Sequence, residues 1–161
     1  MVRKALKEMD KRLHEDIFGA SSSKVQVDMD ELVLAGHSFG GITAINSSFQ
    51  LSQAEQPRAV LVMDPWLYAT AEDIQSGKVH LKCPIQVILS ETWQGRIPKE
   101  EFDSYSTIKK MLNNCESTLP RESVTVRKSD HYTQTDFAIV APFELSLLEA
   151  SLPQTHYGHA Y

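Results

Sequence analysis

A serine flanked by glycines is the residue of this sequence whose surroundings best suit covalent chemistry. Residues 31–41 join a short apolar run to the pattern Gly-x-Ser-x-Gly, and a helix-like segment follows. This arrangement is typical of a nucleophile elbow, a sharp turn that exposes a serine at the carboxyl end of a buried strand. Ser38 is therefore a candidate nucleophile, and a side chain at Gly36, Gly40 or Gly41 is expected to crowd the turn. The alternative is that Ser38 only caps the following helix.

An acid and a histidine follow this serine, each at the end of a strand-like run. Asp64 closes the apolar run 58–63, 26 positions after Ser38 (64 minus 38). His131 follows the alternating segment 123–127, 67 positions after Asp64 (131 minus 64). Serine, acid and histidine in this order are expected when a hydrolase triad lies on successive parallel strands.

These residue types suit acyl transfer to a serine. A serine hydroxyl is a weak nucleophile, so an imidazole has to take its proton during attack, and His131 would do so. The resulting imidazolium needs a fixed carboxylate, here Asp64. The oxyanion needs preorganised donors, and one would be the backbone N–H of Phe39. The prediction at this point is a serine hydrolase of unspecified substrate.

Each assignment has competitors within the sequence. Asp64 precedes a proline and could start a turn. Asp73 and Asp103 are weaker alternatives for the acid, whereas Asp130 is expected to be a loop carboxylate. The other histidines are His14, His37, His80, His156 and His159. The first and the last two lie in terminal segments, where solvated histidines are common, and His37 is expected to be structural, with its side chain directed away from the pocket.

Four short strand-like runs alternate with helical segments along the chain. The expected strands are residues 32–35, 58–63, 84–89 and 124–127. The expected helices are residues 2–17, the segment after the elbow, a helix from Pro98 to Cys115 and residues 143–152. This alternation predicts an α/β fold with a partial parallel sheet of about four strands. Ser38, Asp64 and His131 would then meet at the edge formed by the carboxyl ends of the strands.

Length and composition suit one domain. We place a single domain at residues 1–161, with residues 1–24 as a helix plus linker and residues 153–161 as a loose tail. A net charge of -5 and scattered basic residues argue against nucleic-acid binding.

Cys83 and Cys115 fit no metal-site spacing and are expected to be free thiols, and we expect no metal and no cofactor. Without a long apolar run or an apolar start, the sequence favours the cytosol, or the extracellular space if a signal peptide precedes Met1.

Taken together, several segments resemble the platelet-activating factor acetylhydrolase family. They are, in chain order, Gly36-His-Ser-Phe-Gly-Gly41, Met63-Asp-Pro-Trp66, Val87-Ile-Leu-Ser-Glu91, Ser129-Asp-His131 and Thr135-Asp-Phe137. The resemblance runs from about Leu32 to about Leu148. Because separate motifs recur in the same order, it is more specific than the elbow alone.

This resemblance implies a calcium-independent serine esterase of the α/β-hydrolase fold. Such an enzyme removes a short or oxidised sn-2 acyl chain from phospholipids such as platelet-activating factor, through an acyl-enzyme. The implied nucleophile, acid and base are Ser38, Asp64 and His131, with the amide of Phe39 as one oxyanion donor. Trp66 matches an aromatic residue near the substrate pocket, and a core tryptophan is the alternative. The implied partner is a phospholipid at a membrane or lipoprotein surface.

Only about thirty residues precede the elbow, and the loop that carries the family's second oxyanion donor is not found among them. The resemblance therefore implies that the sequence corresponds to the C-terminal half of such an enzyme. Two further interpretations stay open. One is a general α/β-hydrolase that acts on other carboxylic esters. The other is a catalytically inactive remnant that serves as a binding module.

Overall fold

The computed structural model describes residues 28–93, 102–116 and 118–136, together with positions 8, 11, 12 and 140. Most of the expected first helix and linker lies outside the described residues. The expected helix over residues 143–152 and the tail over residues 153–161 lie outside them as well.

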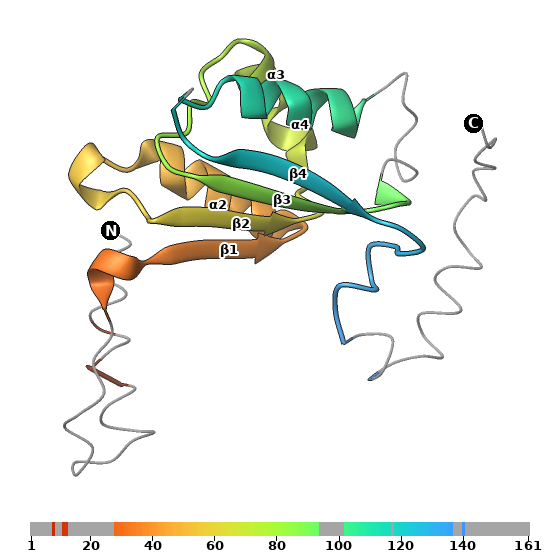
Figure 1. Cartoon of the computed structure of the whole chain (residues 1–161), viewed down its shortest axis with the longest axis horizontal. Coiled ribbons are helices and arrows are strands. Elements are labelled where there is room, and N and C mark those ends of the chain that lie inside the picture. The colour runs from red at the N-terminus through yellow and green to blue at the C-terminus, as the bar shows by residue number, and fades with distance from the viewer. Residues whose placement is uncertain are drawn as a thin grey trace.

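Four parallel strands form one sheet in the order β1-β2-β3-β4 (Figure 1). Their bounds are Val33–His37 for β1, Ala59–Met63 for β2, Ile85–Ser90 for β3 and Arg121–Val126 for β4. The expected parallel sheet of an α/β fold is therefore confirmed. The fourth strand begins earlier than expected, because Arg121 already pairs with Ile85 of β3. Its polar first half has no hydrophobic pattern that would have shown this pairing.

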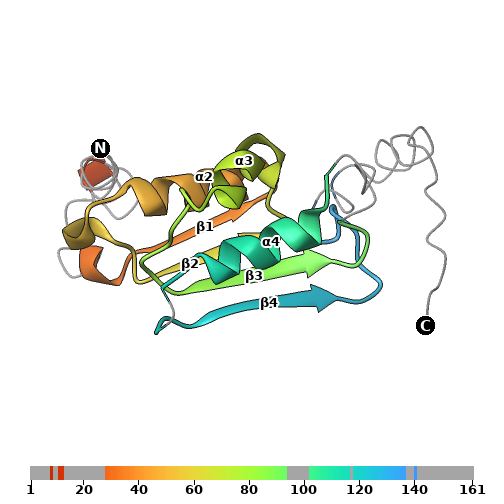
Figure 2. The same ribbon diagram turned by 90° about the horizontal axis from the view of Figure 1, so that it is seen from above.

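The helices that connect these strands cover one face of the sheet. They are α2 (Phe39–Gln50), α3 (Ala71–Gln75) and α4 (Ser104–Asn113), with short 3-10 helices at Gln53–Glu55 (η3) and Leu67–Thr70 (η4). A further 3-10 helix, η2 (Met29–Glu31), precedes β1. Because the strands follow chain order and parallel crossovers are right-handed, successive connections lie on the same side, as Figure 2 shows. None of the described helices is long and apolar enough to cross a membrane.

The core lies between this helical layer and the sheet. It is made by aliphatic side chains of the central strands and of the three helices, among them Ile42, Ile45, Val60, Val62, Ile74, Val87, Ile108 and Met111, each at most 3% exposed. Burial of such side chains contributes about 1.5–3 kcal/mol each. This packing holds the carboxyl ends of the strands at one edge.

Helix α4 begins later than the sequence suggested. Asp103 is its N-cap and accepts a hydrogen bond from the backbone N–H of Ser106 (2.9 Å). The expectation that this helix starts at Pro98 is therefore wrong, although Pro98 itself lies outside the described residues. The capping carboxylate of Asp103 satisfies an amide of the first turn. The backbone of Asp103 is extended (φ -94°, ψ 99°), so the helix begins at the next residue.

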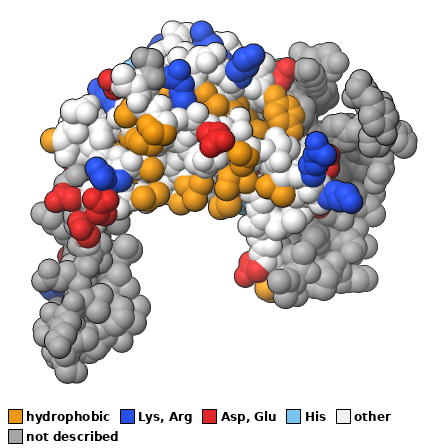
Figure 3. Space-filling model, in the orientation of Figure 1, with side chains coloured by type: hydrophobic (Ala, Val, Ile, Leu, Met, Phe, Trp, Pro, Cys, Tyr) orange, Lys and Arg blue, Asp and Glu red, His pale blue; other side chains and the backbone are white. Residues whose placement is uncertain are grey.

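The opposite face of the sheet carries none of the helices that the structure describes. Side chains alternate along a strand, so those of Val33, Val124 and Val126 are exposed by 50%, 40% and 46%. Figure 3 shows hydrophobic side chains gathered over the strands on this side.

Both cysteines are free and buried, as expected. Burial raises the pKa of Cys83 to about 11 and also raises the pKa of Cys115. Since the thiolate is the reactive form of cysteine, burial and the raised pKa disfavour reaction of both side chains, which pack in the core.

Candidate active site

Ser38 is the single residue between strand β1 and helix α2. Its backbone angles (φ 56°, ψ -119°) lie in a region that side-chain-bearing residues rarely adopt. Three hydrogen bonds hold the turn in this strained shape. The Ser38 N–H donates to the carbonyl of Met63 (2.9 Å), and the Ser38 carbonyl accepts from the N–H groups of Gly41 and Trp66 (3.0 Å each). Strand β2 and the loop after it therefore lock the elbow.

One of the three glycines at this turn is sterically required, and a second lies in a crowded position. A Cβ on Gly36 would overlap the carbonyl of Gly40, and one on Gly41 would lie 3.0 Å from the Pro65 Cβ. A Cβ on Gly40 would meet nothing within 4 Å. The expectation that Gly40 has no room for a side chain is therefore wrong, because this position on the first turn of α2 is exposed to solvent.

The structure brings Ser38, Asp64 and His131 together at the carboxyl edge of the sheet. The Nε2 atom of His131 lies 3.0 Å from the Ser38 Oγ, and its Nδ1 atom lies 3.2 Å from the Asp64 Oδ2. Asp64 is fully buried and His131 is 8% exposed. The hydroxyl of Ser38 makes no helix-capping bond. The interpretation of Ser38 as a mere helix cap is therefore wrong.

The carboxylate of Asp64 is held by a second serine. Ser90, the last residue of β3, donates its N–H to Oδ1 (2.7 Å) and its hydroxyl to Oδ2 (2.6 Å). Asp64 also has a turn-like backbone, with φ 41°. A position in a turn and the contact with His131 are therefore compatible. Sequence reasoning placed Ser90 near the site but missed this role. A serine at the end of a neighbouring parallel strand was the available signal.

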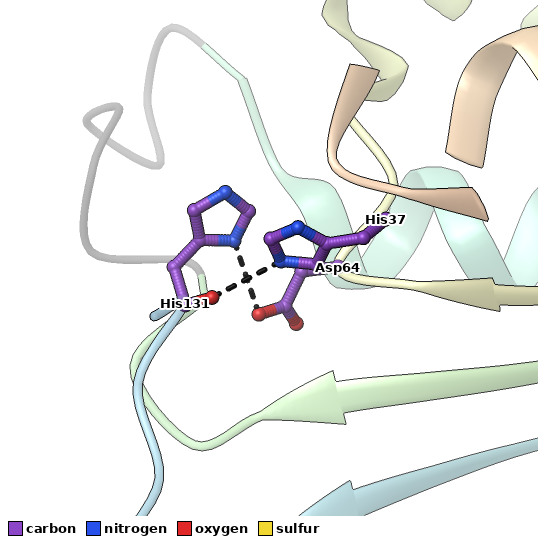
Figure 4. Close-up of side chains that lie close together, drawn as sticks. All are labelled: His37, Asp64 and His131. Atoms are coloured by element: carbon purple, nitrogen blue, oxygen red, sulfur yellow. Dashed lines mark hydrogen bonds and ion pairs between the residues drawn. The ribbon is translucent and has the colours of Figure 1, made fainter. Parts of the chain in front are cut away.

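The imidazole of His131 is stacked between two aromatic rings. The ring of His37 lies 4.3 Å from it, centre to centre, and the ring of Trp93 lies 4.5 Å away, with interplanar angles of 29° and 22°. The Nε2 atom of His37 also lies 3.0 Å from the main-chain carbonyl oxygen of His131 (Figure 4). His37 is therefore a packed, hydrogen-bonded residue, as expected, but its side chain contacts His131 and is not directed away from the site. Sequence reasoning missed Trp93 entirely.

The charge state of His37 follows from these surroundings. Burial lowers the pKa of His37 below its ordinary value of 6.5, and the nearby ring of His131 lowers it further. The His131 carbonyl and the Asp64 carboxylate act in the opposite direction, but less strongly. His37 is therefore neutral at pH 7.

The loop that carries His131 is held by carboxylates at both of its ends. The Oε2 atom of Glu91 accepts the backbone N–H of Lys128 (2.7 Å), a residue with φ 57°. The Oδ1 atom of Asp130 accepts the N–H groups of the two residues that follow His131 (2.8 and 2.9 Å). Asp130 is thus a loop carboxylate, as expected.

The competing candidates have other partners or lie elsewhere. Asp73 pairs with Lys78 (2.9 Å), and Asp103 caps α4. His80 is exposed at the surface. The remaining alternatives, His14, His156 and His159, lie outside the described residues.

Phe39 and Trp66 both border the serine. The N–H of Phe39 opens helix α2 and has no hydrogen-bond partner among the described residues, while its ring is 67% exposed. Trp66 packs against the core and meets Trp93 edge-on, with ring centres 6.2 Å apart. Trp66 is thus both a partly buried packing residue and a neighbour of the site.

The ligand-type atoms of His37, Asp64 and His131 lie within 4.8 Å of one another. A metal ion would need a free lone pair on each imidazole. Both ring nitrogens of His131 are already hydrogen-bonded, to Ser38 and Asp64. A metal ion would have to displace one of these bonds. We therefore interpret the cluster as a group of hydrogen-bonded side chains and not as a metal site.

Comparison with known proteins points to one family. The profile of the family described as platelet-activating factor acetylhydrolase, isoform II, matches residues 6–148. Curated relatives named platelet-activating factor acetylhydrolase include those of Cavia porcellus (29% identical over 120 residues) and Gallus gallus (31% over 121 residues). These matches cover 74% and 73% of this chain. They cover 24% and 25% of the relatives, so the chain spans about a quarter of their length.

Proposed function

The chain belongs to the platelet-activating factor acetylhydrolase family, and from this premise we propose that it is a serine esterase acting on phospholipids. The bond cleaved would be the sn-2 acyl ester, with an acetyl, short or oxidised chain. The observation that carries the proposal is the continuous contact from the Ser38 hydroxyl through His131 to Asp64, at 3.0 and 3.2 Å. This is the arrangement that activates a serine for acyl transfer.

Acylation follows from the geometry of these three groups. The Ser38 Oγ attacks the ester carbonyl carbon while its proton passes to the Nε2 of His131. Asp64 stabilises the imidazolium, because its carboxylate accepts the Nδ1–H and is itself held by Ser90. The N–H of Phe39 is one donor for the oxyanion. Collapse of the tetrahedral intermediate breaks the ester bond, and the leaving lysophospholipid oxygen takes the proton from His131.

Deacylation reverses these roles with water in place of the alcohol. His131 removes a proton from water, whose oxygen attacks the acyl carbon. The Ser38 oxygen then leaves and recovers the proton from His131, releasing the fatty acid. No metal or cofactor is needed for either step, since every proton is transferred between named groups.

The nucleophile can be tested directly with a fluorophosphonate probe, which forms an adduct only with an activated serine. The purified full chain should be labelled on Ser38, and Ser38→Ala should abolish labelling. Ser123→Ala, an exposed serine on β4, is the matched control and should label normally. A chain that is labelled nowhere, or equally well after Ser38→Ala, would favour the inactive binding module.

The substrate class needs its own experiment, because the triad specifies acyl transfer and the phospholipid comes from the family alone. We expect hydrolysis of an sn-2 acetyl phospholipid, with release of the lysophospholipid detected by mass spectrometry. The comparison substrate is a simple aryl acetate. Turnover of the aryl ester without preference for the phospholipid would support a general carboxylesterase instead.

A further inference from the structure

His37 contacts His131 in two different ways. Its ring stacks on the imidazole of His131, and its Nε2 atom lies 3.0 Å from the carbonyl oxygen of the same residue (Figure 4). A carbonyl oxygen can only accept, so the His37 Nε2 has to carry a hydrogen and donate it. The contact therefore selects one tautomer of His37 and joins β1 to the loop after β4.

The two rings next to His131 lie on opposite faces of its imidazole. His37 and Trp93 both stack on it at 4.3 and 4.5 Å, and two rings at these distances would collide if they shared a face. A ring covered on both faces cannot rotate freely about χ2. Such rotation would break the bonds to Ser38 and Asp64 together, because these two bonds use the two nitrogens of one ring.

The position of His37 in the chain adds a further constraint. It directly precedes Ser38 and is the last residue of β1. One rigid strand end therefore carries the nucleophile and also holds the backbone of the base. This matters because His131 lies on a loop, and loops are more mobile than the elements that they connect.

We propose that His37 is a positioning residue that fixes the imidazole of His131 between Ser38 and Asp64. This inference rests on the proposed function and deepens it, since it assigns a role to a residue of the elbow other than the nucleophile. His37 would act through His131 and would not touch the substrate. Its two contributions are the hydrogen bond to the His131 carbonyl and the face of its ring.

Three substitutions separate these contributions. His37→Ala removes both of them. His37→Gln keeps a donor that can reach the carbonyl but has no ring, and His37→Phe keeps the ring but has no donor. His80→Ala, an exposed histidine, is the control.

We expect His37→Ala to lower kcat by about 10- to 100-fold while KM stays within about 2-fold, because misplacement of a catalytic group affects the chemical step. Fluorophosphonate labelling should slow by the same factor. His37→Gln and His37→Phe should each recover part of the loss. Equal kcat in His37→Ala and in His80→Ala would overturn the proposal, and so would a loss shared equally by all three substitutions at His37. If His37→Ala does not fold, the Gln and Phe variants still provide the comparison.

A second readout does not depend on turnover. Nitrogen NMR of histidine-labelled protein reports the tautomer and ring exchange of His131. His37→Ala should broaden or shift these signals, and His37→Gln should shift them less. Wild-type protein that fails to hydrolyse esters but shows this pattern would count against the proposed function alone. An unchanged His131 spectrum in His37→Ala would overturn the positioning role whatever the activity.

Discussion

Ser90 donates two hydrogen bonds to the carboxylate of Asp64, one from its backbone N–H (2.7 Å) and one from its hydroxyl (2.6 Å). Both residues are fully buried. The carboxylate therefore has no access to water and depends on Ser90 and His131 for its donors. A buried charge that loses a donor is costly, because no solvent can replace it.

We predict that Ser90→Ala lowers kcat/KM by about 10- to 100-fold, since a hydrogen bond to a charged group is worth about 1.5–3 kcal/mol. The backbone donor stays, so the fold should survive. Steady-state kinetics on the preferred ester would measure the effect, with Ser123→Ala as the exposed control. Indistinguishable kinetics in the two variants would mean that the hydroxyl of Ser90 does not support Asp64.

The glycines of the elbow offer a matched pair for stability. Gly36→Ala should lower the free energy of unfolding by about 3 kcal/mol, because its Cβ would overlap the Gly40 carbonyl. Gly40→Ala should leave it unchanged or raise it by up to about 1 kcal/mol, because the site is open and alanine favours helix. Urea unfolding monitored by circular dichroism measures both. Equal losses in the two variants would contradict this difference.

Trp93 should contribute to activity through the face of its ring. It is 5% exposed, and its indole N–H has no hydrogen-bond partner among the described residues. Trp93→Phe keeps a stacking ring and removes that unpaired donor, so kcat should stay within about 3-fold. Trp93→Leu should lower kcat by about 10-fold, the equivalent of an aromatic stacking energy of about 1.4 kcal/mol. Stopped-flow or steady-state kinetics that find equal kcat in both variants would rule out a role for stacking.

The lowered pKa of His37 predicts a loss of stability in acid. His37 binds a proton less readily in the folded chain than in the unfolded chain, where its pKa has the ordinary value of 6.5. As the pH falls below 6.5, the unfolded state therefore binds more protons than the folded state. The free energy of unfolding decreases over this range, until the pH falls below the lower pKa that His37 has in the folded chain. Burial and the neighbouring ring of His131 lower the pKa of His37, and the His131 carbonyl and the Asp64 carboxylate oppose them less strongly.

This effect can be measured as the fall in Tm between about pH 7.5 and about pH 5.5. We expect the fall to be smaller in His37→Gln than in the wild type, because the substituted residue does not titrate. His80→Gln, at an exposed position, should behave as the wild type does. An identical fall in all three proteins would show that His37 titrates alike in the folded and unfolded chains.

The elbow, the acid and the histidine could be picked out from the sequence because each lies at the end of a strand-like run. Local patterns of apolar residues specify strands, and right-handed parallel crossovers bring their carboxyl ends to one edge. Chain order then selected Asp64 and His131 from among several acids and histidines. The same reasoning could not find the true start of α4, because an N-cap at Asp103 is decided by a single side-chain bond.

The partners of these three side chains depend on contacts between distant segments. The pairing of Met63 with Ile88 sets the register of β2 against β3 and so places Ser90 against Asp64. Packing across the fold likewise decides where the side chains of His37 and Trp93 point. It also leaves the space next to Gly40 open.

The sequence by itself determined the parallel α/β layout and the three residues that meet at its edge, because both follow from local pattern and chain order. Only the tertiary structure decided which neighbours hold these residues in place. The direction of a side chain depends on strand register and on atoms that are distant along the chain. The periodicity of apolar residues in the sequence specifies neither of these.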